Sequence, residues 1–298
     1  MKTMETKGAV YVITAGFCWG IIGIFTRFLS GCGLDSIQIT LIRNLAAALG
    51  MLLVILATDR EKLKIRLKDS WMFLGTGILS VAFFNICYFK AIEMTTMSVA
   101  AILLYTAPAM VVVMSAVFFR EKLTVQKIVA LLIAFVGCVC TAGMPDETGG
   151  ISGGGILTGL GAGFGYALYS IFGKIALKRY HPFTVTFYTF FFAAVALLPV
   201  GNAGRIAALA QSPRVAAVYG VLGIVSTLVP FLLYTKGLKC IEVGKASVMA
   251  YTEPLVATLC GVLFYRERLD VCNVLGILFI FVSMVLLHIP VRRCVRRG

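Results

Sequence analysis

A glutamate lies inside one of the most apolar stretches of the sequence. Glu253 belongs to a Tyr-Thr-Glu-Pro tetrad at residues 251–254, within an apolar run from about residue 246 to residue 265. A carboxylate at the centre of a membrane helix costs about 2.5 kcal/mol or more, so it is seldom placed there without a role. We expect Glu253 to bind a substrate ammonium group or to take up a proton that couples transport. The alternative is a packing contact with a nearby hydroxyl, amide or lysine.

A near copy of this tetrad lies in the first half of the chain. Residues 105–108 read Tyr-Thr-Ala-Pro, 146 positions earlier, within the apolar run 99–119. The two copies indicate related halves whose symmetry is broken by one acidic residue. Each proline removes a backbone donor, and membrane helices tolerate this where other groups satisfy the backbone. We therefore predict kinks or hinges at Pro108, Pro254 and also Pro230.

Aromatic side chains with a polar tip recur at matching positions of the two halves, and they suit an amphipathic metabolite. Such rings also serve as lipid-interface anchors, and polar side chains at mid-span depth also join helices to one another. Both interpretations stay open for every one of these residues. The candidates for substrate binding are Trp19, Asn85, Tyr88, Tyr105, Tyr166, Tyr169, Thr227, Tyr234, Tyr251 and Glu253.

Three further charged residues require a role. Arg43, near one end of the second apolar run, can bind a carboxylate through two hydrogen bonds. A structural role is favoured, in which it reaches the membrane interface or fastens its helix to a loop. Glu121 and Glu267 each follow an arginine just beyond the fourth and ninth runs. They are interpreted as structural, making helix-end hydrogen bonds or gate latches.

Composition excludes several classes of protein. The 298 residues are 60% hydrophobic and only 13% charged, whereas soluble domains are about 45–50% apolar and about 25% charged. So apolar a chain excludes a nucleic-acid-binding role despite its net charge of +14. The nine cysteines form no C-x-x-C pair and the two histidines are far apart, so we predict no metal site and no cofactor. No phosphate-binding G-x-x-x-x-G-K-[ST] motif is present, which argues against ATP as the energy source.

Ten apolar stretches, each close to the length needed to cross a bilayer, position these residues. The predicted fold is therefore an all-α integral membrane protein embedded in the lipid bilayer. The predicted spans are residues 9–29, 37–57, 70–89, 98–119, 125–143, 153–174, 183–200, 214–235, 246–265 and 272–289.

Charge sets the predicted orientation of the ten spans. An even number of spans places both termini on one side, and most of the 27 lysines and arginines fall on that side. Cytoplasmic loops carry such an excess. We expect a multi-pass protein of the plasma (inner) membrane with both termini in the cytoplasm.

The two halves align well beyond the tetrads. Phe118, Arg120 and Glu121 match Phe264, Arg266 and Glu267, and further matches join the third to the eighth span and the first to the sixth. We expect two five-helix repeats, at residues 1–148 and 149–298. Because five is odd, the second repeat must cross the membrane in the opposite sense, and inverted repeats are typical of alternating-access transporters.

At this point the chain resembles the drug/metabolite transporter superfamily, in its EamA-type branch. The likeness rests on the doubled spans, on Arg43 within Leu-Ile-Arg-Asn, and on a proline followed about a dozen residues later by glutamate (Pro108 with Glu121, Pro254 with Glu267). The resemblance implies a central cavity lined mainly by the first, third, fourth, sixth, eighth and ninth helices. It also implies transport of a small metabolite, often export of amino acids or related compounds. The second repeat departs from the pattern, because Thr189 occupies the position equivalent to Arg43.

The function expected is secondary transport of a small organic metabolite across the plasma membrane by alternating access. A passive channel or facilitator is the alternative, and a membrane-embedded enzyme is a further one that lacks a recognisable catalytic cluster. The sequence does not identify the substrate. It also leaves open whether the chain acts alone or as a homodimer.

Overall fold

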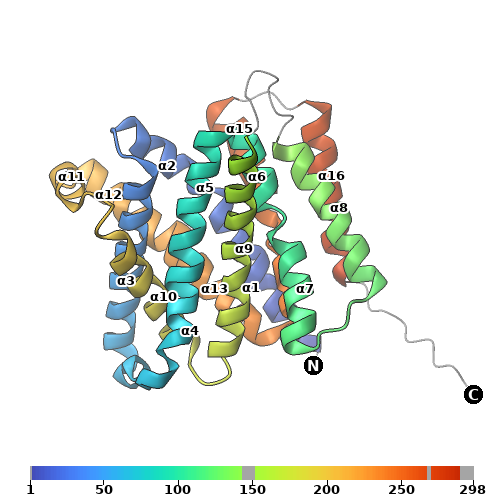
Figure 1. The fold of residues 1–298 in the computed structure, drawn as a ribbon, viewed down its shortest axis with the longest axis horizontal. Helices are drawn as coiled ribbons and strands as arrows, with labels where there is room; N and C mark the ends of the chain where they lie inside the picture. Colours follow the sequence, from blue (N-terminus) through green and yellow to red (C-terminus); the bar gives the residue numbers. More distant parts are fainter. Residues whose placement is uncertain (1, 143–151, 267–269, 289–298) are drawn as a thin grey trace, which may run out of the picture.

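The computed structural model describes residues 2–142, 152–266 and 270–288, and these residues form a bundle of helices (Figure 1). Eight helical segments are long and apolar enough to cross a membrane, and two shorter apolar helices accompany them. The predicted all-α fold with ten spans is confirmed. The predicted junction between the repeats, at residues 148 and 149, lies outside the described residues.

The first five spans are built from the following elements. They are α1 (Lys2–Gly20) with α2 (Ile22–Gly31), α3 (Ser36–Thr58), α4 (Ser70–Leu74) with η3 (Gly75–Ala82) and α5 (Phe83–Met94), α6 (Met97–Leu104) with α7 (Ala107–Phe119), and α8 (Val125–Ala142). Two short 3-10 turns, η1 (Arg60–Leu63) and η2 (Leu67–Asp69), connect α3 to α4.

The second five spans follow the same plan, with one extra helix in a connection. They are α9 (Gly153–Ala176), α10 (Pro182–Leu197), α12 (Pro213–Gly223) with η4 (Ile224–Leu228) and α13 (Val229–Cys240), α14 (Val243–Met249) with α15 (Thr252–Tyr265), and α16 (Val271–His288). The extra helix α11 (Ala203–Leu209) lies between α10 and α12.

Close backbone contacts show that the repeats are inverted. A Cβ atom on Gly8 would come within 2.7 Å of the Cβ of Cys240, and one on Gly155 within 3.1 Å of the Cβ of Met94. These two contacts join equivalent positions of the repeats. The first lies at the end of the bundle where the chain begins, the lower end in Figure 1, and the second lies at the upper end. One repeat therefore runs upward where the other runs downward.

The fourth and ninth spans are broken in the middle. The sequence predicts kinks in continuous spans, but α6 ends before Tyr105 and α7 begins at Ala107, and α14 and α15 are divided in the same way around Tyr251. Pro108 and Pro254 cannot donate the hydrogen bond that would continue each helix, so the break comes one turn before the proline. The hydroxyl of Tyr251 donates a hydrogen bond of 2.5 Å to the carbonyl of Tyr105, which ties the two breaks together.

The third and eighth spans each contain a π-helical segment, η3 and η4, at matching positions. Pro230 follows η4 without ending the span, because α13 continues from Val229. Since η3 occurs without a proline, the π-helical turns belong to the repeat rather than to Pro230. Such turns are rare in helices and are often found at functional sites.

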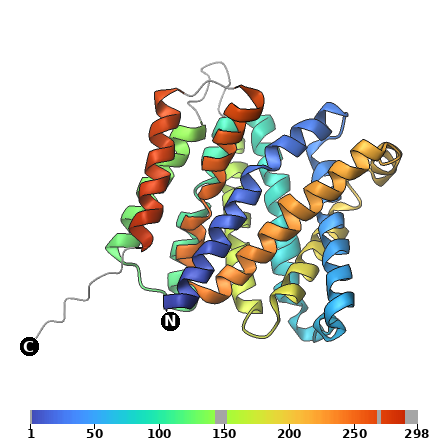
Figure 2. The same cartoon turned by 180° about the vertical axis from the view of Figure 1, so that it is seen from behind.

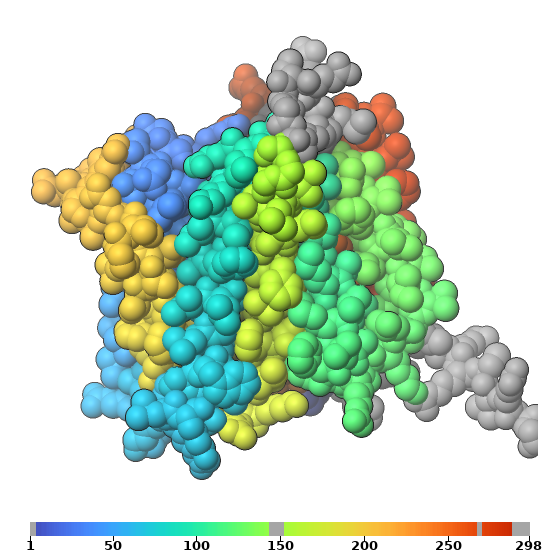
Figure 3. Space-filling view, viewed as in Figure 1, coloured from blue at the N-terminus to red at the C-terminus, as the bar shows by residue number. Residues whose placement is uncertain are grey.

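Two outer helices form a separate edge of the bundle. α8 and α16, the fifth helix of each repeat, lie side by side in both views (Figures 1 and 2). A Cβ on Gly137 would approach the carbonyl of Gly276 to 2.8 Å, so the two backbones nearly touch. On the face drawn in Figure 3, the side chains of α5, α9 and α7 form a contiguous surface.

Candidate functional site

Two adjoining cavities lie between the repeats. They share the ring of Tyr166, and their volumes of about 10 and 20 Å³ give each of them room for about one water molecule in this conformation. The first is lined by Trp19, Ser80, Val81, Phe84, Tyr166, Tyr169, Ser170, Phe231 and Tyr234. The second is lined by Leu104, Tyr105, Ala107, Pro108, Tyr166, Ser247, Ala250, Tyr251, Glu253 and Pro254.

The lining comes from six spans, the first, third, fourth, sixth, eighth and ninth. This is the set of helices implied by the resemblance stated above. Broken helices place their ends at the second cavity, since Tyr105, Ala107, Ala250 and Tyr251 all flank the breaks. Discontinuous helices of this kind present unpaired backbone groups and helix dipoles to a binding site in transporters.

Glu253 lies in the first turn of α15, at the wall of the second cavity. Arg43 of α3 is close enough to interact electrostatically with it, and Tyr166 interacts with both charges. Across the residues that the structure describes, neither charged side chain makes a hydrogen bond, and neither has an ion-pair partner within 4 Å. Two opposite charges held near each other without contact can each receive a group of a bound ligand.

Small residues of α1 determine where Glu253 sits. A Cβ on Gly16 would lie 3.2 Å from the backbone nitrogen of Glu253, and one on Gly20 would lie 2.8 Å from its carbonyl oxygen. The first turn of α15 therefore rests directly on the backbone of α1. This close packing, which small residues permit between membrane helices, fixes the position of the carboxylate.

The tyrosine hydroxyls at the cavities fall into two groups. The hydroxyl of Tyr169 is hydrogen-bonded to that of Thr235 (2.6 Å), and that of Tyr234 to that of Ser170 (2.8 Å). These two hydrogen bonds join α9 to α13. In the described part of the chain, the hydroxyls of Tyr105 and Tyr166 make no hydrogen bond, so they are available to a ligand.

Trp19 and Tyr88 extend the aromatic surroundings of the site. The ring of Trp19 packs edge-on against Phe231, with the centroids 5.1 Å apart, and lies 5.5 Å from Tyr234. Tyr88 is near enough to Glu253 to interact with it electrostatically, although it does not line either cavity. Tyr88, Tyr105 and Tyr166 thus all lie near Glu253, whereas Trp19 lines the neighbouring cavity.

Two polar candidates, Asn85 and Thr227, make hydrogen bonds within the packed helices instead. Asn85 donates to the carbonyl of Val81 (2.7 Å) and accepts from the hydroxyl of Thr40 (3.4 Å). Thr227, fully buried in η4, donates to the carbonyl of Leu222 (3.0 Å). Neither residue lines either of the two cavities described above.

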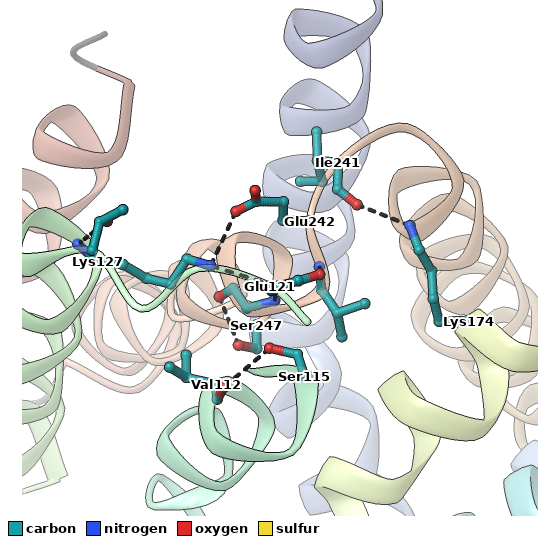
Figure 4. Close-up of polar contacts among 11 residues, drawn as sticks. Val112, Ser115, Glu121, Lys127, Lys174, Ile241, Glu242 and Ser247 are labelled. Atoms are coloured by element: carbon teal, nitrogen blue, oxygen red, sulfur yellow. Dashed lines mark hydrogen bonds and ion pairs between the residues drawn. The ribbon is translucent and has the colours of Figure 1, made fainter. Parts of the chain in front are cut away.

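Glu121 lies at the lower end, where the connection between α7 and α8 meets the second repeat (Figure 4). Its carboxylate accepts hydrogen bonds from the backbone N–H groups of Val243 (2.6 Å) and Gly244 (3.1 Å), the first two residues of α14. Glu121 thus makes helix-end hydrogen bonds across the boundary between the repeats. Glu267, its repeat mate, lies outside the described residues.

Lys127 and Glu242 complete this cluster, and the sequence alone did not single them out. Lys127 is only 2% exposed, and its ammonium lies 3.5 Å from Glu121 and 3.0 Å from Glu242. On the other side of the same turn, Lys174 donates hydrogen bonds to the carbonyls of Leu238 and Ile241 (Figure 4). A lysine so close to the end of an apolar span was a signal that a partner is needed, but its partners are distant in sequence.

Comparisons with known proteins agree with this architecture. The profile of the EamA-like transporter family matches the chain twice, at residues 6–143 and 153–289. The chain is 27% identical over 286 residues to the uncharacterized transporter YxxF of Bacillus subtilis, covering 95% of this chain and 89% of that protein. It is 28% identical over 274 residues to an uncharacterized transporter of Archaeoglobus fulgidus, covering 90% and 92%.

Two further likenesses cover nearly the whole chain. The uncharacterized inner membrane transporter YicL of Salmonella typhimurium is 27% identical over 299 residues, covering 97% of this chain and 98% of that protein. A crystal structure with 17% sequence identity superposes with a TM-score of 0.79 over 94% of this chain and 96% of the other, which shows a shared fold. With a family profile that matches both halves, this multi-pass membrane protein belongs to the EamA-like transporter family.

Proposed function

We propose that the protein is a secondary transporter that moves a small organic metabolite, an amino acid or a related compound, across the plasma membrane. One observation carries the proposal. Glu253 lies on the wall of an internal cavity between inverted repeats, Arg43 is close enough to interact with it electrostatically, and neither charge has an ion-pair partner among the described residues.

The chemistry of the cavity suits a zwitterion with an apolar portion. Glu253 would receive an ammonium group and Arg43 a carboxylate, while the rings of Tyr105 and Tyr166 would cover the apolar portion. The free hydroxyls of these two tyrosines offer further hydrogen bonds. No metal or other cofactor enters this proposal, and catalysis is not part of it.

The unequal burial of two equivalent half-helices supports alternating access. Of the seven residues of α14, Val243 to Met249, all but Lys245 are buried at the lower end. Its repeat mate α6 is far more open at the upper end, where Met97 is 70% exposed and only Val99 and Ala100 are buried. The described state is thus closed below and looser above, and exchanging these two conformations between the repeats would expose the cavity to the other side.

Orientation and direction complete the proposal. We place the lower end in the cytoplasm because the basic residues gather there, and we propose export driven by a gradient of protons or solute. A homodimer is compatible with this arrangement.

Flux measurements test the proposal. The purified protein is reconstituted into liposomes, and uptake of labelled amino acids is measured with and without unlabelled solute on the opposite side. A carrier gives saturating flux that is accelerated by solute on the far side. Linear flux without such acceleration would favour a channel or passive facilitator, and chemical conversion of the solute would favour an enzyme.

A further inference from the structure

Lys127 is a buried charge that binding at the central cavity does not explain. Its side chain is 2% exposed and lies between the carboxylates of Glu121, 9% exposed, and Glu242, 48% exposed. A buried lysine is costly unless it is paired. Each of the two carboxylate partners of Lys127 is connected to α14 in a different way. Glu121 binds the N-terminus of α14, and Glu242 directly precedes that helix.

The short helix α14 links this cluster to the cavity. Gly244, whose N–H is held by Glu121, accepts a hydrogen bond from the hydroxyl of Ser247 (2.9 Å; Figure 4). Ser247 lines the second cavity, and α14 ends at Met249, just before Ala250 and Tyr251 on the cavity wall. Only two helical turns separate the ion cluster from the binding space.

The same positions at the upper end carry no such charges. The repeat mate of Lys127 is Asn273, which exchanges hydrogen bonds with Asp270 and donates to the carbonyl of Cys140. The repeat mate of Glu242 is Thr96, whose hydroxyl accepts from the N–H of Val99 at the start of α6. At these two positions the lower end has charged side chains joined in an ion pair, whereas the upper end has neutral side chains that make hydrogen bonds.

We propose that Glu121, Lys127 and Glu242 form an ionic latch that holds α14 closed and makes the lower-closed conformation the resting state. Opening the lower end requires Lys127 to separate from two carboxylates. Glu242 directly precedes α14 and moves with it, and Glu121 binds the N-terminus of α14. The upper half-helix α6 lacks this pair of charges and opens at lower cost. The inference rests on the proposed alternating access, and it assigns the difference between the two ends to two residues, Lys127 and Glu242.

The repeat itself supplies the variants. Lys127→Asn and Glu242→Thr introduce at the lower end the residues that already serve the upper end, while Glu121 keeps its hydrogen bonds to α14. The control is Lys64→Asn, which removes a lysine from an exposed pair with Glu61 (2.6 Å; 75% and 71% exposed) at the same end.

Thiol accessibility gives the readout, in a background from which the nine native cysteines have been removed. One reporter is Ser247→Cys, 3% exposed on α14, treated with a membrane-impermeant reagent from the lower side. The other is Ala101→Cys, its repeat mate on α6, treated from the upper side. Melting temperatures are recorded for every variant, so that a folding defect is recognised.

The latch predicts faster modification at position 247 by roughly fivefold or more in both latch variants, the scale of a typical coupling energy, and no change with Lys64→Asn. A simultaneous fall at position 101 would support alternating access as well. A rise at 247 with no change at 101 would keep the latch and overturn alternating access. An unchanged rate at 247 in folded Lys127→Asn or Glu242→Thr would overturn the latch. If one variant fails to fold, the other decides.

Discussion

At the scale of single residues, the site is asymmetric in a specific way. Arg43 belongs to the first repeat, and its mate in the second repeat is the neutral Thr189. Glu253 belongs to the second repeat, and its mate in the first repeat is the neutral Ala107. Thr189 donates to the hydroxyl of Thr76 (2.7 Å) and is fully buried, so its position is used for packing. Under the proposed function, one positive and one negative group would define a single orientation for a zwitterionic solute.

Replacing Glu253 by glutamine should abolish recognition of an ammonium group. A ligand at 100 times its Kd stabilises the wild type by about 2.7 kcal/mol, and this gain should vanish in Glu253→Gln while the melting temperature without ligand is retained. The measurement is thermal melting against pooled amino acids, amines, sugars and organic acids. Glu61→Gln, at an exposed lower-end pair, is the matched control. An unchanged ligand response in Glu253→Gln would remove the carboxylate from the binding site.

The limits of residue-level prediction are visible at Asn85, Tyr169 and Lys127. Polarity and depth in the membrane marked the first two as candidates, but whether a hydroxyl or amide faces a ligand or a neighbouring helix depends on partners such as Thr40 and Thr235. Lys127 lies at the start of the fifth predicted span, and the sequence does not reveal its partner because Glu242 is more than 100 positions away. Glu253 was identifiable because a charge within an apolar run stands out without its neighbours.

At the scale of elements, the prolines correctly located the irregular parts of the fourth and ninth spans. The sequence predicted kinks there, whereas the structure has breaks between separate helices. The π-helical turns had no such marker. They accompany Gly77 and Gly223, where a Cβ would lie 2.8 Å from the Cβ of Phe192 and 2.2 Å from that of Ala46. These contacts join equivalent pairs of residues in the two repeats. Tertiary packing, which a single sequence does not display, thus decides where the helix widens.

Gly20 should be intolerant of even one methyl group. A Cβ there would lie 2.5 Å from the Cβ of Val256 and 2.8 Å from the carbonyl oxygen of Glu253. Gly20→Ala must separate α1 from α15, at a cost of about 1–3 kcal/mol as in other overpacked sites, and displace Glu253. The melting temperature and the ligand-induced shift should both fall.

Gly23 provides the matched control for this prediction. It lies three residues further along the same span, and among the described residues no atom beyond its chain neighbours and its own helix backbone lies within 4 Å of the position of its Cβ. Gly23→Ala should be neutral or stabilise by up to about 1 kcal/mol through the unfolded state. Equal effects of the two substitutions would show that helix propensity, not contact with α15, governs this span.

The start of α10 should make stability depend on pH. The Nδ1 atom of His181 accepts the N–H of Phe183 (3.2 Å) as a helix cap, which requires the neutral ring. Burial, then the nearby Lys62, Lys239 and Lys236, lowers the pKa of His181. Because the unfolded chain then binds the proton more readily, the contribution of His181 is present above the ordinary histidine pKa of about 6.5 and is lost as pH falls below it.

His181→Asn tests this cap, since asparagine caps helices well and does not titrate in this range. The melting temperature of the wild type should fall more steeply than that of the variant between about pH 7 and pH 5, around the usual histidine pKa. Parallel pH profiles for the two proteins would contradict the assigned cap.

At the scale of the whole molecule, the sequence predicts two five-span repeats that cross the membrane in opposite directions. Hydropathy and the odd number of spans are enough for this prediction, and no knowledge of residue contacts is required. The difference in burial between the two ends could not be predicted from the sequence, because it depends on how tightly equivalent half-helices pack. Val243 is fully buried, whereas its mate Met97 is 70% exposed. In the proposed alternating access this difference would belong to the conformational state, since each half-helix would adopt the packing of the other.

The sidedness of the bundle is the remaining prediction. Lys64, 75% exposed between η1 and η2, belongs to the most basic connection, and positive connections are retained in the cytoplasm. The exposed helix α11 lies at the upper end (Figure 1). In whole cells without native cysteines, an impermeant maleimide should modify Ala207→Cys in α11, and should modify Lys64→Cys only after permeabilisation. The reverse pattern would place the latch on the outside, so that its opening would admit solute from the exterior rather than from the cytoplasm.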